Sequence, residues 1–198
     1  MSYTPGYGDI VFTLQQLWVA TLAANNSYGT PAQIGYAQDF DFSPEHDEDM
    51  IKAGGANVEA LKVLIGGSIK ISEAAMAYAA YAIITGDSAS TSGTSGNLIT
   101  TMDNEAGGDG TPYVGVAAVF AATHGARFVF GAPKCMATKP SFKAAQNTFR
   151  TGELNLSVLT PKAPPAALYR PRKYENVADV PDFSLAADWD SYFAGMFG

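Results

Sequence analysis

The two histidines and the single cysteine are the side chains of this chain best suited to nucleophilic chemistry. Such catalysis needs a base beside the nucleophile, and neither His46 nor His124 belongs to a triad motif. We therefore expect both histidines to be solvated loop residues. Cys135 lies in the largely apolar run Phe128–Met136 and follows no predicted helix N-terminus. We expect Cys135 to be a small core residue, and we expect the protein not to be an enzyme.

Acidic residues gather at two places where a cation could bind. Glu45, Asp47, Glu48 and Asp49 lie in the stretch SPEHDED, and a second acidic stretch spans Asp103–Gly110. Neither spacing matches a calcium loop, which needs alternate carboxylates, a central glycine and a distal glutamate. We therefore favour a solvated loop at each of the two places, and calcium binding is the alternative. No glycine-rich phosphate-binding or dinucleotide-binding motif is present, so we expect no metal and no cofactor.

The composition indicates a surface that is covered by other protein. Charged residues make up 16% of the chain, against about 25% in an ordinary globular protein. Because a monomer uses charge to cover its outside, this depletion favours a homo-oligomer. A monomer with a neutral Gly/Ala/Ser/Thr-rich surface is the alternative. The net charge of −7 argues against a protein that binds nucleic acid tightly. The basic cluster Arg170, Arg172 and Lys173 is too short to form a nucleic-acid patch.

We find no pattern that would place the chain in a membrane. The first residues lack a basic region followed by an apolar core, so we expect no signal peptide. The most apolar predicted helix is too short, because about fourteen residues span roughly 20 Å and the hydrocarbon core is about 30 Å thick.

The central stretch Asn57–Gly86 organises the rest of the chain. We predict a strand at Val58–Ile65, a tight turn at Gly66-Gly67 and a second strand at Ser68–Ser72, where apolar and polar residues alternate. A buried helix should follow, with Ser72 as N-cap, Glu73 in its first turn and Gly86 at its C-terminal end.

Period-two alternation and apolar runs predict the other strands. They are Trp18–Leu22 (with a helix over Ile10–Leu22 as the alternative), Ile34–Phe42, Leu98–Met102, the hairpin Tyr113–Thr123 and Ala126–Met136 around His124-Gly125, and Glu153–Leu159. Asn25–Pro31 and the Ser/Thr/Gly-rich stretch Asp87–Asn97 are predicted to be loops, the second of them flexible.

Both ends of the chain read as arms of one domain over residues 1–198, with a core at about 10–160 and a C-terminal arm at about 161–198. Prolines after Pro161 should keep that arm extended and outside a sheet. It is too aromatic for a free tail, and Leu185 to Met196 shows helical spacing behind Ser184. The arm should therefore dock on its own core or on a neighbouring subunit.

The order of these elements resembles the major tail protein of long-tailed bacteriophages, the subunit of the tail tube. The resemblance covers roughly Ile34–Thr160: the strand QIGYAQDFDFS, the central strand–turn–strand–helix, a flexible loop, the hairpin YVGVAAVFAATHGARFVFGAPKCMA and the strand GELNLSVLT. It implies a mainly β fold, a β-sandwich or partial barrel with one buried helix. It also implies hexameric rings whose sheets join around a central channel. The C-terminal arm goes beyond the layout of that family.

The resemblance implies a structural virion protein of the tail, synthesised in the host cytoplasm. Its rings would stack into a tube with an acidic lumen, through which DNA passes without specific binding, and its partners would be copies of itself, a tape measure protein and tail tip or terminator proteins. Polar faces of the predicted strands are candidates to line the lumen: Asp39, Asp41, Glu153, Asn155 and Ser157. Such faces could equally meet outer solvent.

Aromatic residues of the two arms are candidates for contacts between subunits: Tyr3, Tyr7, Tyr169, Tyr174, Trp189, Tyr192 and Phe193. A capsid decoration or head-completion protein is the alternative function, because such proteins are also β-rich and adherent.

Overall fold

The computed structural model describes most of the chain. The described residues are 13–35, 37–53, 56–73, 78–94, 97–103, 111–122, 125–138, 141–143, 151–161 and 167–197.

Strands dominate the structure. They are β1 (Thr13–Thr21), β2 (Ala32–Gln33), β3 (Ala37–Ala53), β4 (Ala56–Glu73), β5 (Ser88–Thr94), β6 (Asn97–Asp103), β7 (Val114–Ala121), β8 (Arg127–Ala137), β9 (Ser141–Lys143), β10 (Thr151–Val158) and β11 (Arg170–Tyr174). The helices are α1 (Tyr78–Thr85), the short 3-10 helix η2 (Val177–Asp179) and α2 (Ala186–Tyr192). The prediction of a mainly β fold is therefore confirmed.

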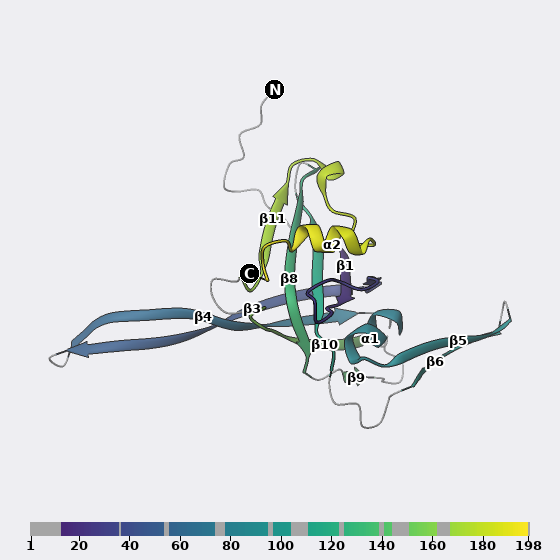
Figure 1. Ribbon diagram of the computed structural model, residues 1–198, viewed down its shortest axis with the longest axis horizontal. Helices are drawn as coiled ribbons and strands as arrows, with labels where there is room; N and C mark the ends of the chain where they lie inside the picture. Colours follow the sequence, from purple (N-terminus) through teal and green to yellow (C-terminus); the bar gives the residue numbers. More distant parts are fainter. Residues whose placement is uncertain are drawn as a thin grey trace.

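Nine of the strands form one antiparallel sheet in the order β2-β1-β7-β8-β10-β4-β3, with β11 paired to β8 and β9 paired to β10. The sheet is not closed, but it curls until β1 and β3 contact each other (Figure 1). The curl brings Phe40 of β3 within 5.8 Å of Phe120 of β7, measured between ring centroids. This arrangement is a partial barrel.

The first hydrophobic core fills the inside of the curl. The side chains of Ile69 and Ile71 from β4 and of Leu154 and Leu156 from β10 are buried there against β1, β7 and β8. Helix α1 adds Tyr81 to this core, together with two smaller apolar side chains. The predicted buried helix is thus present, and Gly86 ends it with a φ of +79° and an amide that donates to the carbonyl of Ala82.

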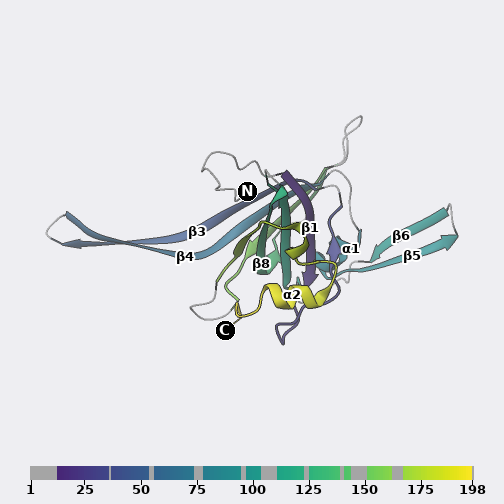
Figure 2. The ribbon, with the colours of Figure 1, turned by 90° about the horizontal axis from the view of Figure 1, so that it is seen from above.

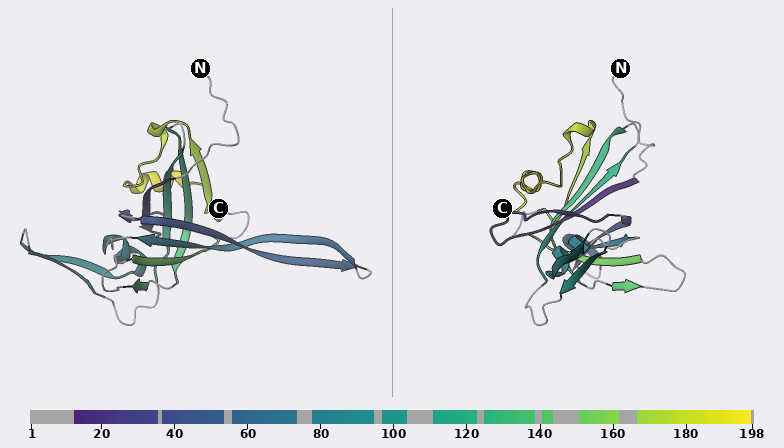
Figure 3. Two further views of the ribbon diagram at one scale, coloured as in Figure 1. Left: turned by 180° about the vertical axis from the view of Figure 1, so that it is seen from behind. Right: turned by 90° about the vertical axis from the view of Figure 1, so that its right-hand side faces the viewer.

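A second hydrophobic core lies on the other face of the sheet, under α2 (Figures 1 and 3). Trp189, Tyr192 and Phe193 pack there against Tyr28 and the strands β7 and β8. The prediction of a helix near the C-terminus is confirmed. The C-terminal residues therefore complete the fold of their own chain, and among the described residues they are not an extended arm.

Two hairpins project from opposite sides of this body (Figures 1 and 2). The longer hairpin consists of β3 and β4, which pair from Ala37↔Glu73 at the body to Ala53↔Ala56 at the tip. The shorter one consists of β5 and β6, which form a separate two-stranded sheet.

Most strands lie where the alternation of apolar and polar residues predicts them. β1 and β6 overlap the predicted strands, β10 covers Glu153–Val158, and β7 and β8 pair around Gly125, whose φ is +82°. The strand predicted at Ile34–Phe42 begins at Ala37. The helix considered for Ile10–Leu22 is wrong over its described part, because β1 occupies Thr13–Thr21.

The tight turn predicted at Gly66-Gly67 is wrong. Both glycines lie inside the continuous strand β4, and the chain reverses between Ala53 and Ala56 instead. A Cβ at Gly67 would lie 2.8 Å from Cε2 of Phe42, so glycine is needed there for the close approach of an aromatic ring. The acidic stretch Ser43–Asp49, predicted as a loop, is consequently part of β3.

Three further predictions differ from the structure. Ser72 does not cap a helix, since Ser72 and Glu73 end β4 and α1 begins at Tyr78. The predicted flexible loop Asp87–Asn97 contains β5, which pairs with β6. Pro171 was expected to keep its segment out of a sheet, yet β11 pairs with β8 as an outer strand. A proline is compatible with an edge, where its missing N–H can face away from the ladder.

Candidate functional site

Three neighbouring strands carry one polar face. The pairing of β3 with β4 and of β4 with β10 aligns polar residues in rows across the strands. The rows are Asp39–Ser72–Glu153, Asp41–Lys70–Asn155 and Ser43–Ser68–Ser157. All five residues predicted as lumen candidates therefore share one surface. Their grouping follows from the structure, whereas the water that this surface meets stays a prediction.

The opposite face of the same strands explains why the rows are aligned. Ile69, Ile71, Leu154 and Leu156 alternate with the polar residues and are fully or almost fully buried in the first core. A shift of one residue in either pairing would exchange the buried and the polar sets. The burial of the isoleucines and leucines thus fixes the register, and the register places the polar rows.

We call the surface formed by the nine residues of the three polar rows the polar face. It is weakly acidic. Asp39, Asp41 and Glu153 face a single cation, Lys70, which gives a net charge of −2. Nζ of Lys70 lies 3.7 Å from Oε1 of Glu153, and both side chains are partly exposed. Such a pair contributes at most about 1 kcal/mol to stability. Lys70 was not among the predicted site residues, although its place in the alternating segment Ser68–Ser72 puts it on this face.

The described residues bring together no catalytic or metal-binding group. No cluster of three or more His, Cys, Asp or Glu side chains that could hold a metal ion occurs among them. His46 is exposed on β3, and His124 lies outside the described residues. Cys135 is fully buried, as predicted, and desolvation raises the pKa of its thiol, which disfavours the reactive thiolate.

The aromatic residues predicted for contacts between subunits take different positions. Tyr3 and Tyr7 lie outside the described residues. Tyr169 stacks on Phe130 with 5.5 Å between ring centroids, and Tyr174 is partly buried against the second core. Trp189, Tyr192 and Phe193 are buried inside their own chain, so of the two docking sites considered, this structure shows the chain's own core.

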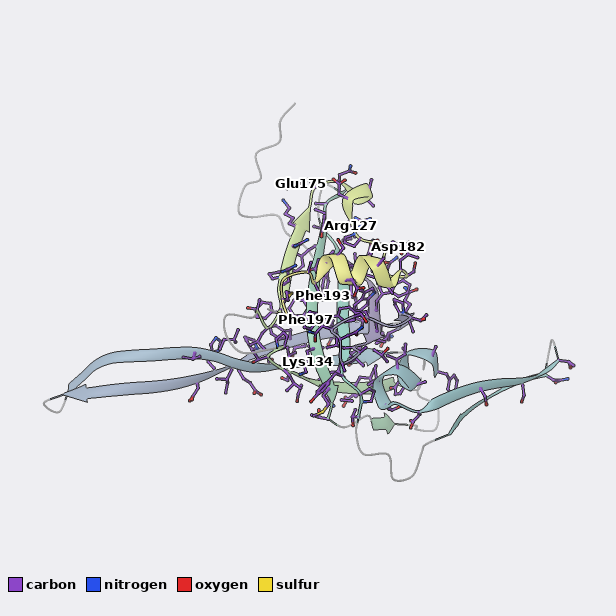
Figure 4. All side chains as sticks on the ribbon, viewed as in Figure 1. Arg127, Lys134, Glu175, Asp182, Phe193 and Phe197 are labelled. Atoms are coloured by element: carbon purple, nitrogen blue, oxygen red, sulfur yellow. The ribbon has the colours of Figure 1, made fainter. Side chains whose placement is uncertain are left out.

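Hydrogen bonds join the C-terminal helix to the sheet. The guanidinium of Arg170 donates to the carbonyl oxygens of Tyr192 and Ala194, where α2 ends. The hydroxyl of Tyr192 donates in turn to the carbonyl of Arg170, 2.5 Å away, and the carbonyl of Val129 lies 3.3 Å from the same hydroxyl oxygen. Burial of this region lowers the pKa of Arg170, an effect to which Arg172 adds, and desolvation raises the pKa of Tyr192. Arg170 of the basic cluster therefore anchors the C-terminal end of α2 to β11. Phe193, the residue that follows α2, is labelled in Figure 4.

Comparisons with known proteins do not assign this chain to a family. The chain matches no protein-family model, and it matches no curated protein. Among solved structures, a chain of the "anti-feeding prophage (AFP) baseplate" is similar over 87% of this chain and 97% of that one, with 12% sequence identity and a TM-score of 0.37. A TM-score of this size does not establish a common fold. None of the helices in the described part of the chain is long and apolar enough to cross a membrane.

Proposed function

We propose that this chain is a structural virion protein, which assembles with copies of itself into stacked rings that form the tube of a phage tail. The observation that carries the proposal is the pair of hairpins that project beyond the body of the sheet (Figure 2). Hexameric rings, as in the family that the sequence resembles, are the expected arrangement.

Projecting two-stranded hairpins need partners. An isolated hairpin is at best marginally stable in water, and the free edge of a strand is a template for pairing with another chain. Among the described residues, β3 pairs with β4 alone, so no strand is hydrogen-bonded to its other edge. Closure of such edges in a ring of identical subunits would remove this exposure.

The surface of the chain supports the same conclusion. Only 16% of the residues are charged. A chain with so little charge is suited to burial against other subunits.

The polar face of β3, β4 and β10 is our candidate for the wall of the tube. Its net charge of −2 per chain would repel the phosphates of DNA, so the genome would pass without specific binding. Uncharged serine and asparagine side chains fill the rest of the face. A tape measure protein and tail tip or terminator proteins are the expected partners, and the tail of the virion is the expected location.

Electron microscopy of the purified protein tests this proposal. Negative-stain images of concentrated protein should show rings or hollow rods, because copies of the chain would then cover one another's open strand edges. A capsid decoration protein would instead stay dispersed and bind only to preformed shells. Dispersed particles at every concentration would contradict the proposed tube. If the protein also bound to empty capsids, it would be a capsid decoration protein.

A further inference from the structure

We infer that the β5–β6 hairpin of one copy pairs with the open edge of β4 in the next copy, at Val63–Gly66. This inference rests on the proposed self-assembly and names the two surfaces that meet. It commits the β4 edge to a second copy of this chain rather than to another protein.

The edge of β4 opens where the long hairpin leaves the body. β4 has 18 residues, and β10 pairs with its last seven, Gly67–Glu73, which leaves eleven residues without a strand on that side among the described residues. Val63 and Ile65 lie in this open segment and are 47% and 54% exposed. Ile65 is the extra residue of a β-bulge, since Glu45 pairs with Gly66 and His46 pairs with Leu64.

The open β4 edge carries neither a charge nor a proline over Val63–Gly66, next to the body, whereas Lys62 and the bulge at Ile65 are its protective features. Charged side chains, especially lysine, and prolines normally discourage another strand from adding to an edge. Residues Val63–Gly66 contain neither, and they present two apolar side chains to solvent. A second strand placed here would continue the sheet from β4 beyond the point where β10 ends.

The β5–β6 hairpin is equally unprotected. No charged residue and no proline occurs between Ser88 and Met102, and among the described strands β5 and β6 pair only with each other. Seven residues in each strand span about 23 Å, which is shorter than the open segment of β4. A seven-residue strand that ends at Gly66 would reach back to Ala60, short of the tip of the longer hairpin, and the uncharged β5–β6 hairpin places no like charge beside Lys62.

The charges of the other candidate edges disfavour them as partners. The stretch from Glu45 to Lys62 in the long hairpin carries five acidic residues and two lysines, a net charge of −3, so two long hairpins would repel each other. β11 presents Pro171, Arg172 and Lys173 at an exposed edge, the composition that prevents strand addition. The neutral β5–β6 hairpin meets neither obstacle.

The positions of the two hairpins determine the kind of assembly. They project from opposite sides of the body (Figures 1 and 2), so one copy offers the hairpin where the next offers the β4 edge. Such a contact joins two different surfaces, and its repetition produces closed rings or open filaments.

Disulfide trapping between two variants that each carry one added cysteine tests the contact. Ser92→Cys carrying a size tag, mixed with untagged Ile65→Cys and oxidised at an assembling concentration, should give a mixed dimer on a non-reducing gel. Native Cys135 is fully buried and does not interfere. Val177→Cys replaces Ile65→Cys as control, because Val177 is 51% exposed and lies on η2, away from the proposed contact. A mixed dimer with the control, or disulfides of Ser92→Cys with itself only, overturns the inference.

An added lysine provides the second readout. Ile65→Lys should raise the concentration needed for assembly by about tenfold or more, because the contact would bury an unpaired charge. Val177→Lys should assemble like the native protein, and both variants should keep the native unfolding temperature. If native protein forms rods and Ile65→Lys forms them equally well, this inference fails while the proposed function stands. If native protein forms no assembly at all, the proposed function fails and the inference fails with it.

Discussion

Single residues decide how the C-terminal helix sits on the sheet, and Gly131 of β8 shows this most clearly. A Cβ at Gly131 would lie 2.4 Å from Cε1 of Tyr192 and 2.8 Å from Cε1 of Phe193. The same is true of Gly115 on β7, where a Cβ would lie 2.4 Å from Cε1 of Tyr28. Bare backbone at these two positions lets large aromatic rings contact the sheet directly.

Replacement of Gly131 by alanine should therefore weaken the fold. Gly131→Ala should lower the free energy of unfolding by about 1–3 kcal/mol, because the added methyl group forces Tyr192 and Phe193 out of their positions. The matched control is Gly35→Ala, since a Cβ at Gly35 has no neighbour within 4 Å, and its effect should stay within about 0.5 kcal/mol. Denaturant titration measures both. Equal stability of the two variants would mean that α2 does not rest on Gly131.

At the scale of strands and helices, the sequence predicts the parts of the fold that follow from alternation. β10 alternates and is half-buried, so its pattern in the sequence is unambiguous. The paired strands β7 and β8 follow instead from two long apolar runs, whose residues are mostly buried. The five lumen candidates could be assigned to polar strand faces for the same reason. That these faces lie on adjacent strands could not be predicted, because strand order depends on contacts between distant segments.

The wrong predictions share a physical cause. Gly66-Gly67 was predicted to be a turn, yet Gly67 admits the ring of Phe42 inside a continuous strand, which is a tertiary effect. β5 was missed because its serine, threonine and glycine residues are typical of a loop, whereas its pairing with β6 decides its structure. The docking of residues 167–197 was left open because an aromatic helix fits its own sheet and a neighbour equally well.

Charge reversal on the polar face tests its assignment to the lumen. Asp39→Lys changes the net charge of the face from −2 to 0 and lies in a different row from Lys70. Virions that carry this variant should eject DNA more slowly, because the wall would repel phosphates less, and the difference should shrink at high ionic strength.

The control for this experiment is Asp179→Lys, an exposed residue on η2 outside the polar face. Both variants should form tubes and should unfold at the same temperature as the native protein. Native ejection kinetics in Asp39→Lys virions, with tubes intact, would place Asp39 outside the lumen. The polar face would then meet outer solvent.

At the scale of the whole molecule, one physical feature connects the sequence with the structure. Charge is scarce along the chain, and the sheet is left open with two hairpins extending from opposite sides (Figure 2). Both observations have the same explanation if other copies of the chain supply the missing strands and cover the neutral surface. In the proposed tube, the number of subunits in a ring and the stacking of rings would follow from that association.

Sedimentation velocity over a wide range of protein concentration tests self-association most directly. The protein should pass from a 20.8 kDa species at high dilution to much larger particles as its concentration rises, since the contacts join unlike surfaces and can be repeated. A single monomeric species at every concentration would contradict the view that this open, charge-poor sheet is completed by copies of itself.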